Sequence, residues 1–393
     1  MREAMINPED LKRVETEEDI AVKAGFALQA PIYALGTPVN EVGEENYRAS
    51  RRDFEKLPAF KRLVKDALAQ IENEKRADGH GKLSDLKMVQ DGTIEVPNQR
   101  APLHISKRAF EQMLYRAGMP KGSASYLENC APALRSTNMN EWLRRSDDSI
   151  LLRTRKSASG GREIYATLSD HRYHKYDIDR LANALVESIP TGARGEFIYD
   201  GSRYQLKAHF HSDIQPKSAV AGEIFRASVI VDSADDGSCA LRVRAAVTRN
   251  LCRNLIILHT AKKEEQATHL DADLETKIPE MIKGACERVS GFAERWTQAT
   301  RERIAEEAAG MYDATPIFER LIDEGLVEAP NVSDDDLLAR LVRAFSEEPG
   351  GTRADVLNAI TRAAHEETWA NPWASSDLEE QAGKLLYNFQ LWG

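Results

Sequence analysis

The sequence lacks long apolar runs. No stretch of about 18 apolar residues occurs in the 393-residue chain, which excludes an ordinary membrane-spanning helix. Residues 1–19 are polar throughout and contain no apolar core of the kind that secretory signal peptides have. We therefore expect a cytoplasmic protein that makes no contact with a membrane.

The sequence is also poor in cysteine and in the common catalytic motifs. Its four cysteines are scattered and form no C-x-x-C pair, which argues against a disulfide framework or a zinc site. It has no phosphate-binding GxxxxGK[ST] loop, no GxGxxG after a strand, and no GxSxG, HExxH or EF-hand pattern. We expect neither a bound cofactor nor a bound metal. These absences leave open whether the protein is an enzyme, and we favour a binding protein over a catalyst.

What the sequence does contain is a regular alternation of strand and helix signals. Apolar residues at spacings of three and four predict a helix within residues 46–78. Asp91-Gly92 predicts the turn of a hairpin, and Ser106 predicts the cap of a helix that follows it. Strand-like runs joined by Asp-Gly turns predict a β-rich block from 150 to 263, with one helix that starts at Asp177 as its cap. The last third is mainly helical, with a long interrupted helix over 273–312 and a final helix capped by Ser376.

These patterns predict an α+β fold with a central antiparallel β-rich core and one inserted helix. The expected units are an N-terminal arm and helix (1–83), an α+β core domain (84–263) and an acidic helical C-terminal region (264–393). The hydrophobic fraction of 42% suits such a folded globular protein.

Charge is distributed unevenly along the chain. Residues 1–149 hold 23 Lys and Arg against 24 Asp and Glu, a balance of −1. Residues 150–263 hold 18 against 12, a balance of +6, and residues 264–393 hold 12 against 27, a balance of −15. A basic middle beside an acidic end predicts a surface for a polyanion, with an acidic region that limits access to it. The alternative is that these charges are ordinary solvated faces.

The basic block combines arginine with tyrosine on predicted strands. Arg153 and Arg155 alternate and so share one face of a strand, as do Arg242 and Arg244. Guanidinium groups grip phosphate oxygens, and aromatic rings stack on unpaired bases. The predicted nucleic-acid-binding residues are Arg153, Arg155, Arg172, Tyr173, Lys175, Arg203, Arg242 and Arg244.

Several segments together resemble the phage- and plasmid-associated family known as domain of unknown function 932. They include "LHISKRAFEQMLYRAGMP", "YATLSDHRYHKYDIDRLANAL" and "DDGSCALRVRAAVTRNLCRNLIILHTAKKEE", and the likeness spans roughly residues 84 to 388. Ser169, Asp170 and Tyr173 match a turn of that family, and Cys252 with Asn254 matches its CxN element. The resemblance implies a mobile-element context near recombination genes.

We expect a single-stranded DNA-binding or annealing accessory protein, whose acidic C-terminal region self-associates or contacts a recombination protein. One alternative is an enzyme that acts on a nucleic acid or nucleotide. Its candidate residues are Asp170, His171, Tyr173, Cys252, Asn254 and His259, provided that they converge in one pocket. A second alternative is a non-catalytic assembly or regulatory protein.

Overall fold

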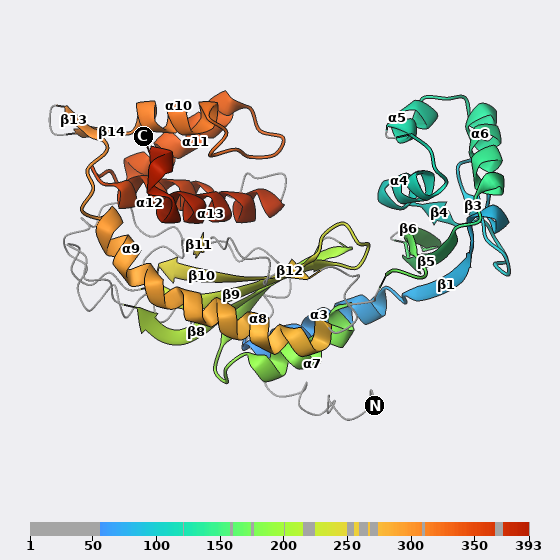
Figure 1. The fold of residues 1–393 in the computed structure, drawn as a ribbon, viewed down its shortest axis with the longest axis horizontal. Helices are drawn as coiled ribbons and strands as arrows, with labels where there is room; N and C mark the ends of the chain where they lie inside the picture. The colour runs from blue at the N-terminus through green and yellow to red at the C-terminus, as the bar shows by residue number, and fades with distance from the viewer. Residues whose placement is uncertain are drawn as a thin grey trace.

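The computed structural model describes residues 56–120, 122–157, 160–173, 177–199, 201–214, 225–249, 255–258, 266–267, 274–308, 311–365 and 372–392. Two lobes are visible in Figure 1. We call residues 77–173 the small lobe and the remaining described residues the large lobe. Together the lobes confirm the predicted α+β fold with antiparallel sheets and a helical C-terminal region.

The small lobe is a four-stranded sheet with helices on one face. The strand order is β1-β5-β6-β4, and a short β2–β3 hairpin lies beside it. Its elements are β1 (Ala77–Lys82), β2 (Lys87–Met88), β3 (Ile94–Glu95), β4 (His104–Ile105), α4 (Lys107–Arg116), α5 (Ser123–Glu128), α6 (Pro132–Arg145), β5 (Ser149–Lys156) and β6 (Arg162–Ser169).

Local signals set the elements of the small lobe. The Asp91-Gly92 turn of the β2–β3 hairpin requires the positive φ of 90° that glycine adopts without strain. Helix α4 begins where Ser106 Oγ accepts a hydrogen bond from the backbone N–H of Ala109. Met113 on α4 and Ile164 on β6 then pack in one hydrophobic core between the helix and the sheet. Both the hairpin and the cap were predicted from the sequence.

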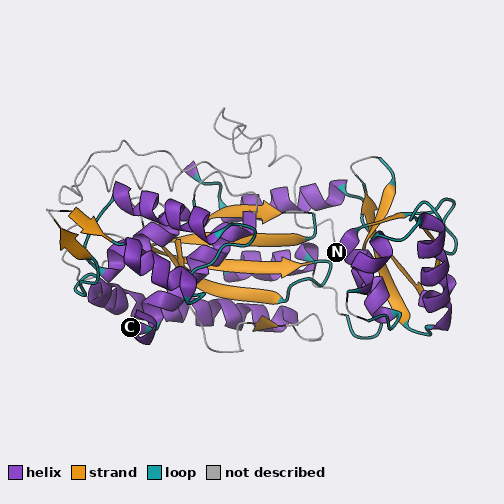
Figure 2. Ribbon diagram, turned by 90° about the horizontal axis from the view of Figure 1, so that it is seen from above, coloured by secondary structure: helices purple, strands orange, loops and turns teal. Residues whose placement is uncertain are grey.

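The large lobe is a curved antiparallel sheet between two helical layers. The strand order is β11-β10-β9-β8-β7, with β12 paired to β10. Its strands are β7 (Arg194–Tyr199), β8 (Arg203–Ile214), β9 (Phe225–Ala234), β10 (Leu241–Arg249), β11 (Leu255–Ile257) and β12 (Gln266–Ala267). Figure 2 shows the long strands side by side, with the small lobe beyond one end of the sheet.

Helices from both ends of the chain cover this sheet. On one face lie α3 (Phe60–Asn73), α7 (Ile178–Ser188) and α8 (Leu274–Arg288). On the other side, α13 contacts β11 (Figure 1). The C-terminal elements are α9 (Phe292–Ala299), β13 (Glu306–Ala308), β14 (Met311–Asp313), α10 (Thr315–Asp323), α11 (Asp334–Glu347), α12 (Arg353–Ala363) and α13 (Pro372–Tyr387). None of the described helices is long and apolar enough to span a bilayer.

The hydrophobic cores divide the chain differently from the boundaries expected at 83 and 263. One core joins α3, the large sheet and the C-terminal helices, and it runs from Phe60 to Trp392. A second core lies within the small lobe. Helix α3 therefore packs with elements that follow it by more than a hundred residues, and the C-terminal helices complete the large lobe.

Two local predictions in the last third of the chain are wrong. The expected helix over 273–312 ends at Ala299, because the backbone N–H groups of Ile304 and Ala305 donate to the carbonyl of Gly351 and draw the chain into a β13–β14 hairpin. Ser376 lies inside α13 rather than at its start, and its hydroxyl accepts from Gln205. Asp177 is the N-cap residue of α7, as predicted, although its side chain makes no capping hydrogen bond.

Candidate functional site

The guanidinium group of Arg153 lies at the interface between the two lobes. Its side chain is only 2% exposed, and Nε lies 3.2 Å from Oδ1 of Asp78 on β1. Nη1 donates to Oδ1 of Asp177 at 2.7 Å and to the carbonyl of Asp235 at 2.6 Å. Asp177 precedes α7, and Asp235 follows β9, so this one side chain connects the small sheet to the large lobe.

A second arginine binds the carboxylate of Asp235 at the same interface. Arg76, between α3 and β1, pairs with Asp235 and also donates to the hydroxyl of Tyr199. The Asp235 side chain is fully buried. Burial is the largest cause that raises the pKa of Asp235 to about 7, and the nearby Asp177 carboxylate raises it further, while the two guanidinium groups oppose both.

Arg155 occupies the same face of β5 as Arg153. Its Nε donates to Oε1 of Glu163 at 2.6 Å, and Nη1 donates to the carbonyl of Gly201. The ring of Tyr165 lies beneath both cations, with its centroid 5.5 Å from Arg153 and 5.2 Å from Arg155. The predicted shared face of these two arginines is confirmed, but it faces the large lobe instead of solvent.

Arg244 on β10 is neutralised by two acids. Its Nη2 donates to Asp232 on the neighbouring strand, and Nη1 donates to Oε2 of Glu380 on α13 at 2.7 Å. Burial alone lowers the pKa of Arg244, but the two carboxylates outweigh it and raise the pKa above its usual value. The guanidinium is therefore a fixed charge that holds α13 against the sheet.

Other C-terminal acids bind the same sheet. Lys207 Nζ lies 3.2 Å from Oε2 of Glu379, and both side chains are buried. Arg249 forms a bidentate ion pair with Glu348, in which both N···O distances are 2.9 Å. The uneven charge along the sequence therefore has a structural counterpart, because acids of the last third pair with cations of the middle third.

Two further predicted arginines lie near this interface. The guanidinium carbon of Arg203 lies 3.9 Å from the ring centroid of Trp373, a close cation–π contact. Arg242 is half-buried and lies on the same face of β10 as Arg244.

The remaining predicted binding residues follow β6 in the sequence. Arg172 is exposed, whereas Tyr173 is half-buried and donates its hydroxyl to the carbonyl of Asp235 at 3.3 Å. Lys175 lies outside the described residues.

The expectation of one open cationic surface is thus wrong for Arg153, Arg155 and Arg244. Each is engaged by the protein's own carboxylates or carbonyls, and the first two belong to a different interface from the third. A buried guanidinium must be paired because an isolated charge in the interior is strongly unfavourable. Strand periodicity correctly placed these residues on shared faces, but it gave no information on what covers each face.

The candidate enzyme cluster is described only in part. Asp170 binds the ring of His80 on β1, while His171 is exposed. Cys252, Asn254 and His259 lie outside the described residues. Within the part of the chain that the structure describes, no group of three His, Cys, Asp or Glu side chains could hold a metal ion.

A row of polar side chains on the large sheet contains a serine, a histidine and an acid, the residue types of a catalytic triad. His209 Nδ1 lies 2.8 Å from Ser228 Oγ, and its Nε2 lies 3.7 Å from Oε1 of Glu196. However, Ser228 is fully buried in the middle of β9, where it is paired with His209 on one side and Ala246 on the other. A nucleophile needs access to its substrate and nearby donors for an oxyanion. This row fits a buried hydrogen-bond chain better than an active centre.

The exposed side chains of α4 were not among the residues predicted from the sequence. Lys107 and Arg108 occupy its first two positions, are exposed, and make no ion pair with another described residue. Tyr115 on the same helix is 81% exposed. Arg108 and Tyr115 are seven residues apart, which is close to two helical turns and places them on one face. An aromatic residue with cations at this spacing within "SKRAFEQMLYR" was the available signal.

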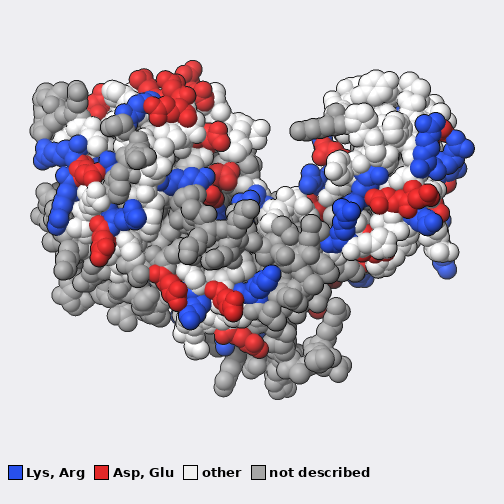
Figure 3. Space-filling view, in the orientation of Figure 1, with Lys and Arg blue, Asp and Glu red and all other residues white. Residues whose placement is uncertain are grey.

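The small lobe as a whole differs in charge from the rest of the protein. It holds 15 Lys and Arg against 11 Asp and Glu, a balance of +4 in a chain of −10. Figure 3 shows a broad hollow between the lobes, and helices α4 and α5 lie on the side of the small lobe that faces it (Figure 1). A ligand that lies along α4 could therefore approach through this hollow.

Comparisons with known protein families, with curated proteins and with solved structures found no match for this chain. The resemblance to domain of unknown function 932 therefore stays a prediction.

Proposed function

We propose that the protein binds single-stranded nucleic acid through α4 of the small lobe, as an accessory factor in DNA annealing or recombination. The proposed surface does not include Arg153, Arg155 and Arg244, because carboxylates of the protein already pair with these three arginines. The observation that carries it is the exposed row of Lys107, Arg108 and Tyr115 on one helix of a net-positive lobe.

The position of the two cations supports a binding role. The first turn of α4 contains no acidic residue. The N-terminus of a helix is the positive end of its dipole, so each cation in the first turn destabilises the helix by about 0.3–1 kcal/mol. Phosphate groups reverse that penalty, because they are attracted both by the side chains and by the helix N-terminus. The two cations would then bind phosphates of the nucleic-acid backbone, and one base of the same strand would stack on the ring of Tyr115.

Binding of a fluorescent oligothymidylate, measured by anisotropy as a function of salt, tests the proposal. Lys107→Glu combined with Arg108→Glu should weaken binding, and the loss of two phosphate contacts should reduce the slope of log K against log salt by about 1.4. These substitutions favour the helix, so weaker binding will not result from unfolding. Tyr115→Ala should cost about 1–3 kcal/mol if one base stacks on the ring.

A matched control is Lys277→Glu with Lys283→Glu on α8, two exposed positions that give the same change in net charge. If the control lowers affinity as much as the α4 variant, the effect is one of overall charge and α4 is not the surface. If the unaltered protein binds neither single-stranded DNA nor RNA at low salt, the proposed function itself is wrong.

A further inference from the structure

The two lobes meet through polar contacts and not through a shared hydrophobic core. Among the described residues, every hydrophobic cluster lies within one lobe. Gln112 on α4 donates to the carbonyl of Asp236 at 2.6 Å, and the backbone N–H of Lys156 donates to the carbonyl of Glu74 at 2.7 Å. Parts of a chain that meet without a large hydrophobic interface are expected to move relative to each other. Further hydrogen bonds across the interface come from Arg153, Arg155 and Tyr173.

Carboxylates outnumber guanidinium groups at this interface. The guanidinium groups of Arg76 and Arg153 each pair with two carboxylates. With every group ionised, two positive and four negative charges would leave this cluster with a net charge of −2. An excess of like charge away from water favours the protonated form of one carboxyl group. The four acids are Glu74, Asp78, Asp177 and Asp235.

Asp235 is the acid of this cluster that is most fully withdrawn from water. Its side chain is 0% exposed, whereas the side chains of the other three acids are 17–23% exposed. Burial disfavours the ionised form of a carboxyl group, so the proton resides preferentially on Asp235. This location agrees with its pKa of about 7.

The remaining ionisable groups near Asp235 are tyrosines and acids that have partners of their own. Burial raises the pKa of all four tyrosines, so they stay neutral near neutral pH. Asp236 accepts a hydrogen bond from the backbone N–H of Ser238. Asp235 is therefore the group at which we expect a proton to be exchanged near neutral pH. The surrounding groups are Tyr165 on β6, Tyr173, Tyr199 on β7, Tyr204 on β8, the Arg155–Glu163 pair and Asp236.

The small lobe covers part of Asp235. Arg153 donates to its backbone carbonyl at 2.6 Å, and Tyr173 donates to the same carbonyl at 3.3 Å. Separation of the lobes would admit water to the Asp235 carboxylate and bring its pKa back toward the ordinary value of 3.8. The closed arrangement, in which the lobes are in contact, therefore holds this proton more tightly than an open one. It loses stability relative to the open arrangement as the pH rises from about 4 to about 7.

We propose that the interface between the lobes is a pH-sensitive hinge, in which loss of the Asp235 proton favours separation of the lobes. Separation would also break the bond from Gln112 to Asp236. Gln112 lies between Arg108 and Tyr115 on one face of α4, because these residues are four and three positions away from it. The motion would therefore change what borders the proposed oligonucleotide-binding surface. Only this last consequence rests on the proposed function.

Small-angle X-ray scattering of the full chain over a series of pH values measures the separation of the lobes. The radius of gyration of the unaltered protein should increase from about pH 5 to about pH 8, because the ratio of open to closed molecules rises by up to about tenfold per pH unit below about pH 7. Helix content from circular dichroism should stay constant, since each lobe keeps its own core. Asp235→Asn has no proton to lose at this position and should remain closed throughout.

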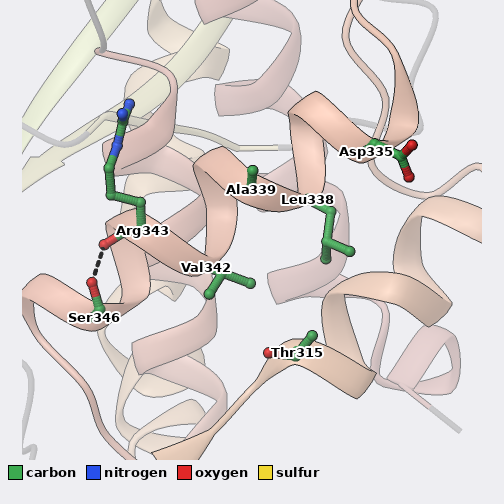
Figure 4. Close-up of a pocket in the computed structure, with 7 residues that line it drawn as sticks. All are labelled: Thr315, Asp335, Leu338, Ala339, Val342, Arg343 and Ser346. Carbon is green, nitrogen blue, oxygen red and sulfur yellow. Dashed lines mark hydrogen bonds between the residues drawn. The ribbon is translucent and has the colours of Figure 1, made fainter.

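Two further variants test the charge and the geometry separately. Asp335→Asn makes the same change in charge at an exposed position on α11, beside an open groove between α10 and α11 (Figure 4), and should open like the unaltered protein. Arg155→Gln removes the bond from Arg155 to the carbonyl of Gly201 and leaves Asp235 unchanged, so this variant should open at a lower pH.

A radius of gyration that stays constant with pH in the unaltered protein would overturn the hinge. So would an equal increase in Asp235→Asn, or an Arg155→Gln variant that opens no earlier than the unaltered protein. The first and third results decide the matter even if Asp235→Asn does not fold. Scattering is measured without an oligonucleotide, so a failure of the hinge is distinct from a failure of nucleic-acid binding.

Discussion

Arg244 on β10 and Glu380 on α13 form an ion pair, with 2.7 Å between Nη1 and Oε2, across 136 residues of sequence. This contact, together with those of Lys207 and Arg249, gives the acidic C-terminal region a structural role. Its carboxylates neutralise Arg244, which was a predicted binding residue, and two other cations of the large sheet. The effects of substitution at these positions should therefore appear in stability before they appear in ligand binding.

Arg244→Ala should lower the free energy of unfolding by about 3–5 kcal/mol, because it leaves the buried Asp232 carboxylate without its guanidinium partner. Urea denaturation followed by circular dichroism measures the loss. Arg172→Ala, which removes an exposed guanidinium, should change stability by less than about 0.5 kcal/mol. Equal melting of the Arg244 variant and the unaltered protein would contradict the buried ion pair.

Asp235 should make stability depend on pH near neutrality. Its pKa is raised from an ordinary value of 3.8 to about 7, so the folded state holds this proton more tightly than the unfolded state. The resulting contribution to stability is fully present below about pH 4 and is lost as the pH rises through about 7.

Asp235→Asn removes that titration. Relative to the unaltered protein, the variant should gain up to about 1.4 kcal/mol of stability per pH unit as the pH rises from about 5 to about 7. Urea denaturation at several pH values provides the measurement, and Asp91→Asn, at an exposed turn, serves as a control. A stability difference between Asp235→Asn and the unaltered protein that stays constant over this range would show that Asp235 has an ordinary pKa.

Gly195→Ala should destabilise the large lobe through steric overlap. A Cβ at this position on β7 would lie 2.9 Å from side-chain carbons of Phe60 and Leu63 on α3 and from the backbone oxygen of Lys207. Overpacking of this kind costs about 1–3 kcal/mol. Gly79→Ala on β1 is the matched control, since its Cβ would have no neighbour within 4 Å. Similar denaturation midpoints for both variants would mean that α3 does not approach β7 this closely.

Local chemistry explains which parts of the fold were predictable. The hairpin at Gly92, the cap at Ser106 and the alternation along β5 and β10 depend on a few neighbouring residues, and each was predicted correctly. The start of α13 and the end of α9 were not, because the hydrogen bonds of Ser376 and Ile304 go to residues far away in the sequence. The exposed row on α4 was not predicted, because helical spacing places Arg108 and Tyr115 on one face without showing that this face meets solvent.

The sequence by itself determined the fold class, the type of most elements and which side chains of a strand share a face. Those properties follow from the period of two along a strand, the period of 3.6 along a helix and the conformations that glycine and capping residues allow. Only the tertiary structure decided that the strand arginines are covered and that the cations of α4 are not. Whether a face meets solvent depends on elements that arrive from elsewhere in the chain, and the partners of Arg153 and Arg244 lie up to 82 and 136 residues away.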